Sequence, residues 1–426
     1  MTPRRPPLAG AVLLCLVLVA CGTSGPTAAP STTAPTASPS ASPSGSAAPP
    51  PDPGTVYATI EEQVRAIRGL QAKQPVDPKV LDEAALGTYI QDQFRKDNPI
   101  ELVEANERLL KGLGLLPPDA SLEDLYIDLL SSQVAGLYNP EDKQLYVVSK
   151  TGALGPTEKT TFAHEYTHAL QDQNFGLAGM ELDAPGEGDR AIARLALVEG
   201  DATLLMTLWQ IQNLTQAEIL QLFSEALDPK VTGALEKMPP VLRESLLFPY
   251  TGGLSFTQRL HGAGGWEAVN DAFAKPPAST EQILHPEKYD SAEAPLKVDL
   301  PDDLAARMGA GWTVGLEDTL GEFQLKLWLA EKAGAGASGA TSAAAGWGGD
   351  RVALLDGPGD AWAIVMRTRW DTPADGSEFD GLAQLALPNA GGVGQYFGSG
   401  TDFWYVIASD RATLEAAAGA AGQTGG

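Results

Sequence analysis

His164-Glu165-Tyr166-Thr167-His168 contains two of the four histidines of the chain and lies within residues 157–175, which we expect to form a helix. Side chains four residues apart lie on one face of a helix, with Cβ atoms about 5–6 Å apart. Both imidazole rings can therefore reach one ion at about 2.0–2.1 Å, the usual distance from zinc to a histidine nitrogen. The spacing predicts a Zn²⁺ site at His164 and His168, with Glu165 beside the metal as general base.

The alternative interpretation is an amphipathic helix with two surface histidines. The residues around the motif argue against it, because Phe162, Ala163, Ala169 and Leu170 give the helix an apolar side that can be buried. We therefore expect a buried helix that carries its histidines into the protein.

A catalytic zinc ion usually has three protein ligands and an open fourth position. The next histidine, His261, is too distant in sequence for a short-spaced third ligand, so acidic residues are the candidates. Those downstream are Glu181, Asp183, Glu187, Asp189, Glu199 and Asp201. We choose Glu199, because it lies in an apolar segment where a carboxylate is costly to bury unless it is paired or binds a metal. Asp201 is the alternative ligand; otherwise Asp201 or Asp172 would orient an imidazole.

The histidine motif followed by Glu199-Gly200 resembles the gluzincin group of metallopeptidases, which includes thermolysin and the aminopeptidase N type. The resemblance covers about residues 134–290. It implies a zincin-like catalytic domain that hydrolyses peptide bonds. The chain has no Gly-x-Met-Glu-Asn segment, which anchors the substrate amino terminus in exopeptidases of that group. This difference favours an endopeptidase over an aminopeptidase.

Two residues are candidates for stabilising the oxyanion of the tetrahedral intermediate. Pro249-Tyr250-Thr251-Gly252-Gly253 is similar to the Pro-Tyr-x-x-Gly segment of aminopeptidase N-like enzymes, and this similarity implies that Tyr250 is the donor. His285 is the alternative catalytic donor, with Tyr289 in the same segment. That segment is also compatible with a capped helix and a turn without a role in the chemistry.

The N-terminus is typical of an exported lipoprotein. Arg4 and Arg5 precede an apolar run that is short for a membrane span, and the run ends at Leu18-Val19-Ala20-Cys21, which resembles a bacterial lipobox. We expect residues 1–20 to be a signal peptide and Cys21 to carry the lipid that anchors the protein to the outer side of the cell membrane.

Composition limits the remaining function classes. With 29 basic and 54 acidic residues the net charge is −25, which makes nucleic acid an improbable partner. The two cysteines lie in the expected signal peptide and at the lipidation site, so we expect neither a disulfide nor thiol chemistry.

We expect a mainly helical α+β fold. Residues 21–54, rich in Pro, Ser, Thr and Ala, are expected to be a disordered linker. A metallohydrolase domain over 55–313 would contain a small β-hairpin at 134–148, and a C-terminal α+β subdomain would cover 314–415. Residues 248–313 are rich in Pro and Gly and predict interrupted structure, and 416–426 predict a flexible tail.

The sequence therefore predicts a zinc-dependent metallopeptidase that acts on peptides or on amide bonds of the cell envelope. One alternative is a non-catalytic lipoprotein that uses a zincin fold for binding or as a scaffold. Another is a structural metal site closed by a fourth ligand such as His285 or Asp201. The sequence does not predict the oligomeric state.

Overall fold

The computed structural model describes residues 13–14, 52–133, 136–148, 154–228, 233 and 235–422. Apart from Leu13 and Leu14, the predicted signal peptide lies outside these residues, as do Cys21 and most of the predicted linker. Within the described part of the chain, no helix has the length and apolar character needed to cross a membrane.

The N-terminal region combines four helices with a small sheet. The helices are α1 (Pro53–Arg68), α2 (Glu83–Asp97), α3 (Ile100–Gly112) and α4 (Leu122–Gln133). The strands are β1 (Leu13–Leu14), β2 (Lys79–Leu81), β3 (Gly136–Asn139) and β4 (Gln144–Val148), in the order β1-β3-β4-β2. β3 and β4 are antiparallel and form the hairpin expected from the sequence.

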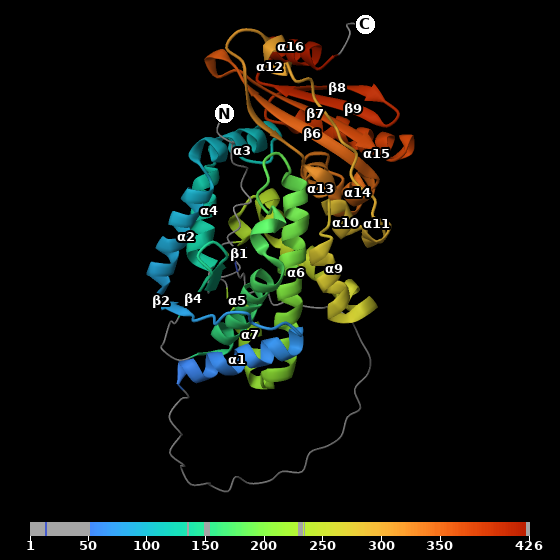
Figure 1. Cartoon of the computed structure of the whole chain (residues 1–426). Helices are drawn as coiled ribbons and strands as arrows, with labels where there is room; N and C mark the ends of the chain where they lie inside the picture. Colours follow the sequence, from blue (N-terminus) through green and yellow to red (C-terminus); the bar gives the residue numbers. More distant parts are fainter. Residues whose placement is uncertain are drawn as a thin grey trace, which may run out of the picture.

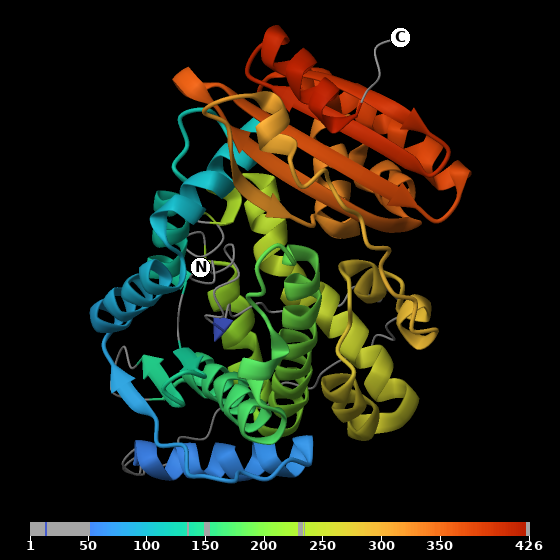
Figure 2. The same cartoon turned by 45° about the horizontal axis from the view of Figure 1, so that its top comes forward.

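The central region is almost entirely helical. Its elements are α5 (Pro156–Phe175), η1 (Leu177–Met180), α6 (Gly188–Asn213), α7 (Gln216–Ala226), α9 (Pro240–Ala274), α10 (Thr280–Leu284), α11 (Pro286–Asp290) and α12 (Leu304–Met308). α6 packs along α9 and against α5, while α1 lies across α5 and α6. Figures 1 and 2 show α1, in blue, at the end of the molecule opposite the C-terminal sheet, in orange and red.

The interruption expected from residue 248 is wrong over its first part, because α9 continues through Pro249 to Ala274. A proline inside a helix removes one backbone hydrogen bond and usually kinks or breaks the helix. Here close packing against α6 holds the helix together around Pro249. The non-helical backbone lies further on, at Gly264 and Gly265, where Gly265 has a φ of 66°.

The C-terminal region is a five-stranded antiparallel sheet covered on both faces. Its strands are β5 (Thr313–Asp318), β6 (Trp347–Asp356), β7 (Trp362–Trp370), β8 (Val393–Ser399) and β9 (Asp402–Ala408), in the order β5-β6-β7-β9-β8. The helical elements are α13 (Gly321–Lys332), α14 (Gly336–Ala344), η2 (Pro358–Asp360), α15 (Pro373–Ala386), η3 (Leu387–Asn389) and α16 (Arg411–Ala421).

Side chains alternate between the two faces of this sheet, as a strand requires. Val352 and Leu354 belong to the core shared with α13 and α15, whereas Ala353 and Leu355 pack with α12 and α16. Figure 1 shows α16 above the sheet and α13 to α15 below it. The expected flexible tail is wrong for residues 416–421, because they complete α16. Ala417, Ala418, Ala420 and Ala421 are buried.

Buried carboxylates join the C-terminal sheet to the start of α6. Asp318 at the end of β5 accepts the Gly188 N–H at 2.8 Å, so a negative charge faces the positive end of the α6 dipole. Asp189 accepts the Thr280 N–H and hydroxyl, and Asp350 accepts the N–H groups of Leu320 and Gly321. We call Asp189, Asp318 and Asp350 the junction carboxylates.

Candidate metal centre

Three buried side chains from α5 and α6 converge on one point. Glu199 Oε2 lies 3.2 Å from His164 Nε2 and 3.5 Å from His168 Nε2. The two Nε2 atoms are 3.0 Å apart. All three residues are at most 1% exposed. We call His164, His168 and Glu199 the metal cluster.

These distances fit a zinc ion. Four ligands at about 2.0–2.1 Å in a tetrahedron lie about 3.3 Å from one another, and the three separations in the cluster fall on either side of that value. The donors are two imidazole nitrogens and a carboxylate oxygen, which zinc accepts in catalytic sites. The residues present therefore match zinc in both type and spacing.

The path of α5 explains why both histidines are buried. The helix starts with Pro156 and ends at Gly176, which has a left-handed φ of 76°. Between them every residue from Thr160 to Gln171 is buried, so α5 has no solvent-exposed face over the motif. Imidazoles in such a helix must be satisfied by protein groups or a metal.

Two glycines bring α6 and α9 into direct backbone contact beside Glu199. A Cβ atom added to Gly200 would lie 2.2 Å from the Gly253 carbonyl oxygen, and one added to Gly253 would lie 2.0 Å from the Ala196 oxygen. No side chain fits there. The contact brings Tyr250, one turn before Gly253, over the cluster: its ring stacks on the His164 ring with centroids 6.3 Å apart.

The charges within the cluster are strongly coupled. Burial opposes ionisation of Glu199, but the charge of His168 and hydrogen bonds from both histidines outweigh it and lower the pKa of Glu199 to about 2. Burial also favours a neutral His168, yet the charge of Glu199 and its hydrogen bond raise the pKa of His168 to about 9. Burial and the charge of His168 lower the pKa of His164. Glu199 is therefore an ionised carboxylate that faces a single cationic ring.

Glu165 is held beside the cluster by the small sheet. Its Oε2 accepts the Tyr138 N–H of β3 at 2.7 Å, and the residue is fully buried. The hydrogen bond fixes the carboxylate between α5 and β3. Glu165 follows the first histidine directly, as the motif requires, and it is not one of the three converging donors.

His285 is not among the converging donors of the metal cluster. His285 Nε2 is 2.9 Å from Glu322 Oε1 on α13, and its other ion-pair partner is Glu287. Carboxylates between α10 and α13 engage this ring, which disfavours the expected role of His285 as an oxyanion donor. Tyr289 donates its hydroxyl to the Lys275 carbonyl oxygen.

The other acidic candidates have different partners. Glu181 pairs with Arg194, and Asp189 belongs to the junction. Asp201 accepts from Arg68 and Gln171 rather than joining the converging donors. Asp172 accepts the Tyr138 hydroxyl and the Leu177 N–H, so the expectation that it orients an imidazole is wrong.

Sequence reasoning missed Gln171, whose Oε1 lies 2.8 Å from His168 Nδ1. Its position three residues after His168 places it on the same face of α5, a signal that could have identified it. It also missed Arg68, whose only clue was a basic residue at the end of an amphipathic helix.

The described residues contain one further group with ligand-like spacing, formed by Glu281, Glu293 and Asp371. Lys288 Nζ lies 2.6, 2.8 and 2.5 Å from these three carboxylates. The ammonium group therefore already lies where a cation would bind and offsets part of the charge of this acidic cluster.

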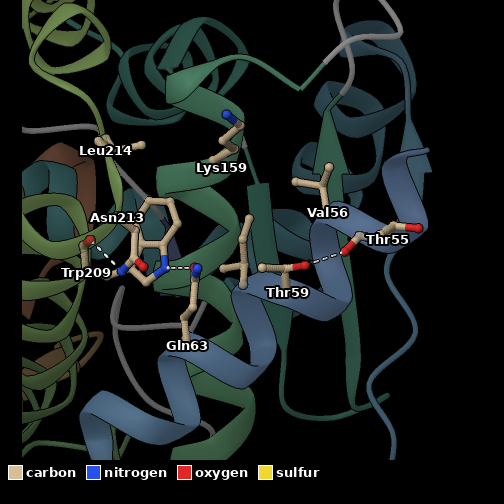
Figure 3. A pocket seen from close by; sticks show the side chains of 9 residues that line it. Thr55, Val56, Thr59, Gln63, Lys159, Trp209, Asn213 and Leu214 are labelled. Carbon is tan, nitrogen blue, oxygen red and sulfur yellow. Dashed lines mark hydrogen bonds between the residues drawn. The ribbon is translucent and has the colours of Figure 1, made fainter. Parts of the chain in front are cut away.

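A hollow of about 260 Å³ lies away from the metal cluster, between α1, the first turn of α5 and the end of α6. Figure 3 shows the hydrogen bond from Trp209 Nε1 to Gln63 in the wall of this hollow, near Thr55, Thr59 and Lys159. None of the three converging ligands lines it.

A family model described as a domain of unknown function, DUF8575, matches residues 312–421. The match covers the C-terminal sheet and its helices and excludes the metal cluster. Comparison with curated proteins and with solved structures gives no match.

Proposed function

We propose that this chain is a zinc-dependent metallopeptidase with a zincin-like catalytic domain. The observation that carries the proposal is the convergence of His164 Nε2, His168 Nε2 and Glu199 Oε2 within 3.5 Å of one another in a buried site. A zinc ion held there would supply a Lewis acid that lowers the pKa of a water molecule and polarises a carbonyl group.

The residues around the cluster have distinct tasks in this proposal. Glu165 takes the proton of the attacking water and delivers it to the leaving amine, while the Tyr138 N–H keeps its carboxylate in place. Tyr250, stacked on His164, donates its hydroxyl to the developing oxyanion. Peptides are the proposed substrates, with an endopeptidase favoured, and amide bonds of the cell envelope are the second substrate class.

Two alternatives make different predictions for the same site. A scaffold protein with a zincin fold would bind zinc and hydrolyse nothing. A structural site would need a fourth protein ligand. His285 and Asp201 are both held by other partners, which favours an open position.

The decisive experiment compares Glu165→Gln with Glu158→Gln, a change in the first turn of the same helix. The amide introduced by Glu165→Gln keeps an oxygen for the Tyr138 N–H but cannot accept a proton. We expect this variant to retain zinc and to lose about 10²–10⁴-fold in turnover of a quenched-fluorescent peptide library, the usual contribution of a general base. Glu158→Gln should retain both. Full turnover by Glu165→Gln would contradict the proposal, and zinc binding without any hydrolysis by the wild type would favour the scaffold.

We also propose that the protein is anchored outside the cytoplasm through a lipid on Cys21, because the residues before it resemble a lipobox. Detergent phase partitioning of cells expressing the wild type or Cys21→Ala tests this. The wild type should enter the detergent phase and the variant should not; equal partitioning would contradict the anchor.

A further inference from the structure

A chain of hydrogen bonds leads from His168 to a helix far away in the sequence. His168 Nδ1 lies 2.8 Å from Gln171 Oε1, and Gln171 Nε2 donates to Asp201 Oδ2 at 2.8 Å. Asp201 in turn accepts two hydrogen bonds from Arg68 of α1, at 2.8 and 3.2 Å. All four residues are completely buried.

Each link in this chain has a fixed direction. Arg68 can only donate, so Asp201 must accept. Gln171 Nε2 faces two acceptors, Asp201 Oδ2 and the Val198 carbonyl oxygen at 2.9 Å, which fixes the orientation of the amide. The Gln171 oxygen therefore faces His168, and Nδ1 of that ring must carry the hydrogen. When the ring binds a metal in its neutral form, Nδ1 keeps this hydrogen, and Nε2, the atom that points into the metal cluster, supplies the lone pair.

Arg68 is held in place by more than its carboxylate. It lies in the last turn of α1, directly before Gly69, whose φ of 74° ends the helix. Its guanidinium group lies 4.5 Å from the centroid of the Trp266 ring and 5.9 Å from that of Phe175. These contacts join α1 to α5 and α9 around one buried cation, so α1 is structurally part of the metal-binding unit.

We infer that Gln171 is a positioning residue that holds His168 with its Nε2 toward the metal, and that Arg68 and Asp201 fix Gln171 in the one orientation that allows this. The inference rests on the proposed metal site and adds a requirement for α1. Groups that hydrogen-bond to metal-bound histidines commonly change metal affinity by about 10–100-fold when they are removed.

The test compares Gln171→Met with Gln210→Met in the full chain. The thioether introduced by Gln171→Met has a similar length but makes none of the three hydrogen bonds. Gln210 is the control because it lies on α6 about 16 Å from Glu199, given a helical rise of 1.5 Å per residue. Among the described residues its side chain makes one hydrogen bond, a long one of 3.5 Å to Thr160. The measurements are the zinc dissociation constant by chelator competition, the visible spectrum of the Co²⁺ form, and the melting temperature of the metal-free protein.

We expect Gln171→Met to weaken zinc binding about 10–100-fold and to alter the Co²⁺ spectrum, while Gln210→Met changes neither. A purely structural role would lower the melting temperature and leave the Co²⁺ spectrum unchanged, which would overturn the inference. Zinc binding by Gln171→Met equal to that of the wild type would also overturn it and leave the metal site standing. Absence of zinc binding in the wild type would instead refute the site itself.

A paired variant tests the same chain of hydrogen bonds and can be used if Gln171→Met does not fold. Gln171→Glu with Asp201→Asn keeps the total charge. The hydrogen bond between positions 171 and 201 is reversed, because the new amide at position 201 donates to the new carboxylate at position 171. Position 171 still accepts from His168 Nδ1, as Gln171 does in the wild type. We expect the pair to bind zinc more tightly than either single variant. Weaker binding by the pair than by both single variants would contradict the requirement that position 171 accepts a hydrogen bond from His168.

Discussion

The metal cluster and the junction carboxylates both bury acidic groups on or against α6, but with opposite electrostatic results. At the cluster the charge of His168 lowers the pKa of Glu199 to about 2. At the junction burial raises the pKa of Asp318 and of Asp350 to about 6, although both accept backbone N–H bonds. Burial also raises the pKa of Asp189 well above its usual value.

The difference lies in the partners. Backbone N–H groups satisfy the hydrogen-bonding capacity of a carboxylate but carry no net charge to offset the loss of solvation. A cationic ring or guanidinium group supplies that charge. α6 therefore has at its start a carboxylate that tends to take up a proton, and in its middle Glu199, which remains ionised and is free to bind a metal.

The largest expected effect comes from removing the cation at the cluster end. Arg68→Met leaves Asp201 buried without its charge partner, which should lower the free energy of unfolding by about 3–5 kcal/mol. Arg95→Met is the matched control, because Arg95 pairs with Glu123 on the surface with 53% of its side chain exposed. That change should cost no more than about 1 kcal/mol. Urea denaturation measures both, and equal losses would contradict the account of the buried pair.

A smaller loss of stability is expected from disturbing the helix packing beside the metal cluster. Gly253→Ala places a Cβ 2.0 Å from the Ala196 oxygen, so α6 and α9 must move apart beside Glu199. Overpacking of this kind costs about 1–3 kcal/mol, and the displacement of Glu199 should weaken zinc binding. Gly262→Ala on the same helix meets no atom within 4 Å and should be neutral or stabilising. Similar melting temperatures and zinc affinities for the two variants would show that the close contact is unimportant.

The smallest expected effect concerns pH at the junction. Burial raises the pKa of Asp318 from 3.8 to about 6. The folded state therefore binds this proton more tightly than the unfolded state, and the resulting stability is fully present below about pH 3.8 and is lost as the pH rises through 6. Asp318→Asn keeps Oδ1, which accepts both the Gly188 and Thr319 N–H groups, but cannot ionise.

Urea denaturation of the metal-free protein at pH 4.5 and 7.5 (about one unit or more on either side of the transition) measures this effect. The wild type should lose about 2 kcal/mol more stability than Asp318→Asn over that interval. If both proteins lose the same amount, Asp318 is ionised throughout and the contrast with Glu199 does not hold.

Local periodicity was enough to predict several of these features. The four-residue spacing of His164 and His168 predicts a shared face, and the structure brings their Nε2 atoms to 3.0 Å. A carboxylate in the apolar surroundings of Glu199 implies a partner, and the histidines of α5 fill that role. The β-hairpin and the long helices also follow from local patterns.

Features that depend on tertiary contacts could not be predicted from local sequence. Pro249 and its neighbouring glycines indicate a break, yet packing against α6 keeps α9 continuous. The alanines near the C-terminus indicate fraying, but the sheet buries them as part of α16. Arg68 reaches Asp201 across 133 positions, and no local pattern encodes such a pairing.

The measurement that tests the central claim most directly is the zinc content of the purified protein after metal loading and removal of loosely bound ions, compared between wild type, Glu199→Ala and Asp201→Ala. The account predicts about one zinc ion per wild-type chain and a far greater loss of zinc from Glu199→Ala than from Asp201→Ala. A wild-type protein without zinc, or a greater loss from Asp201→Ala, would contradict the assignment of His164, His168 and Glu199 as the metal ligands.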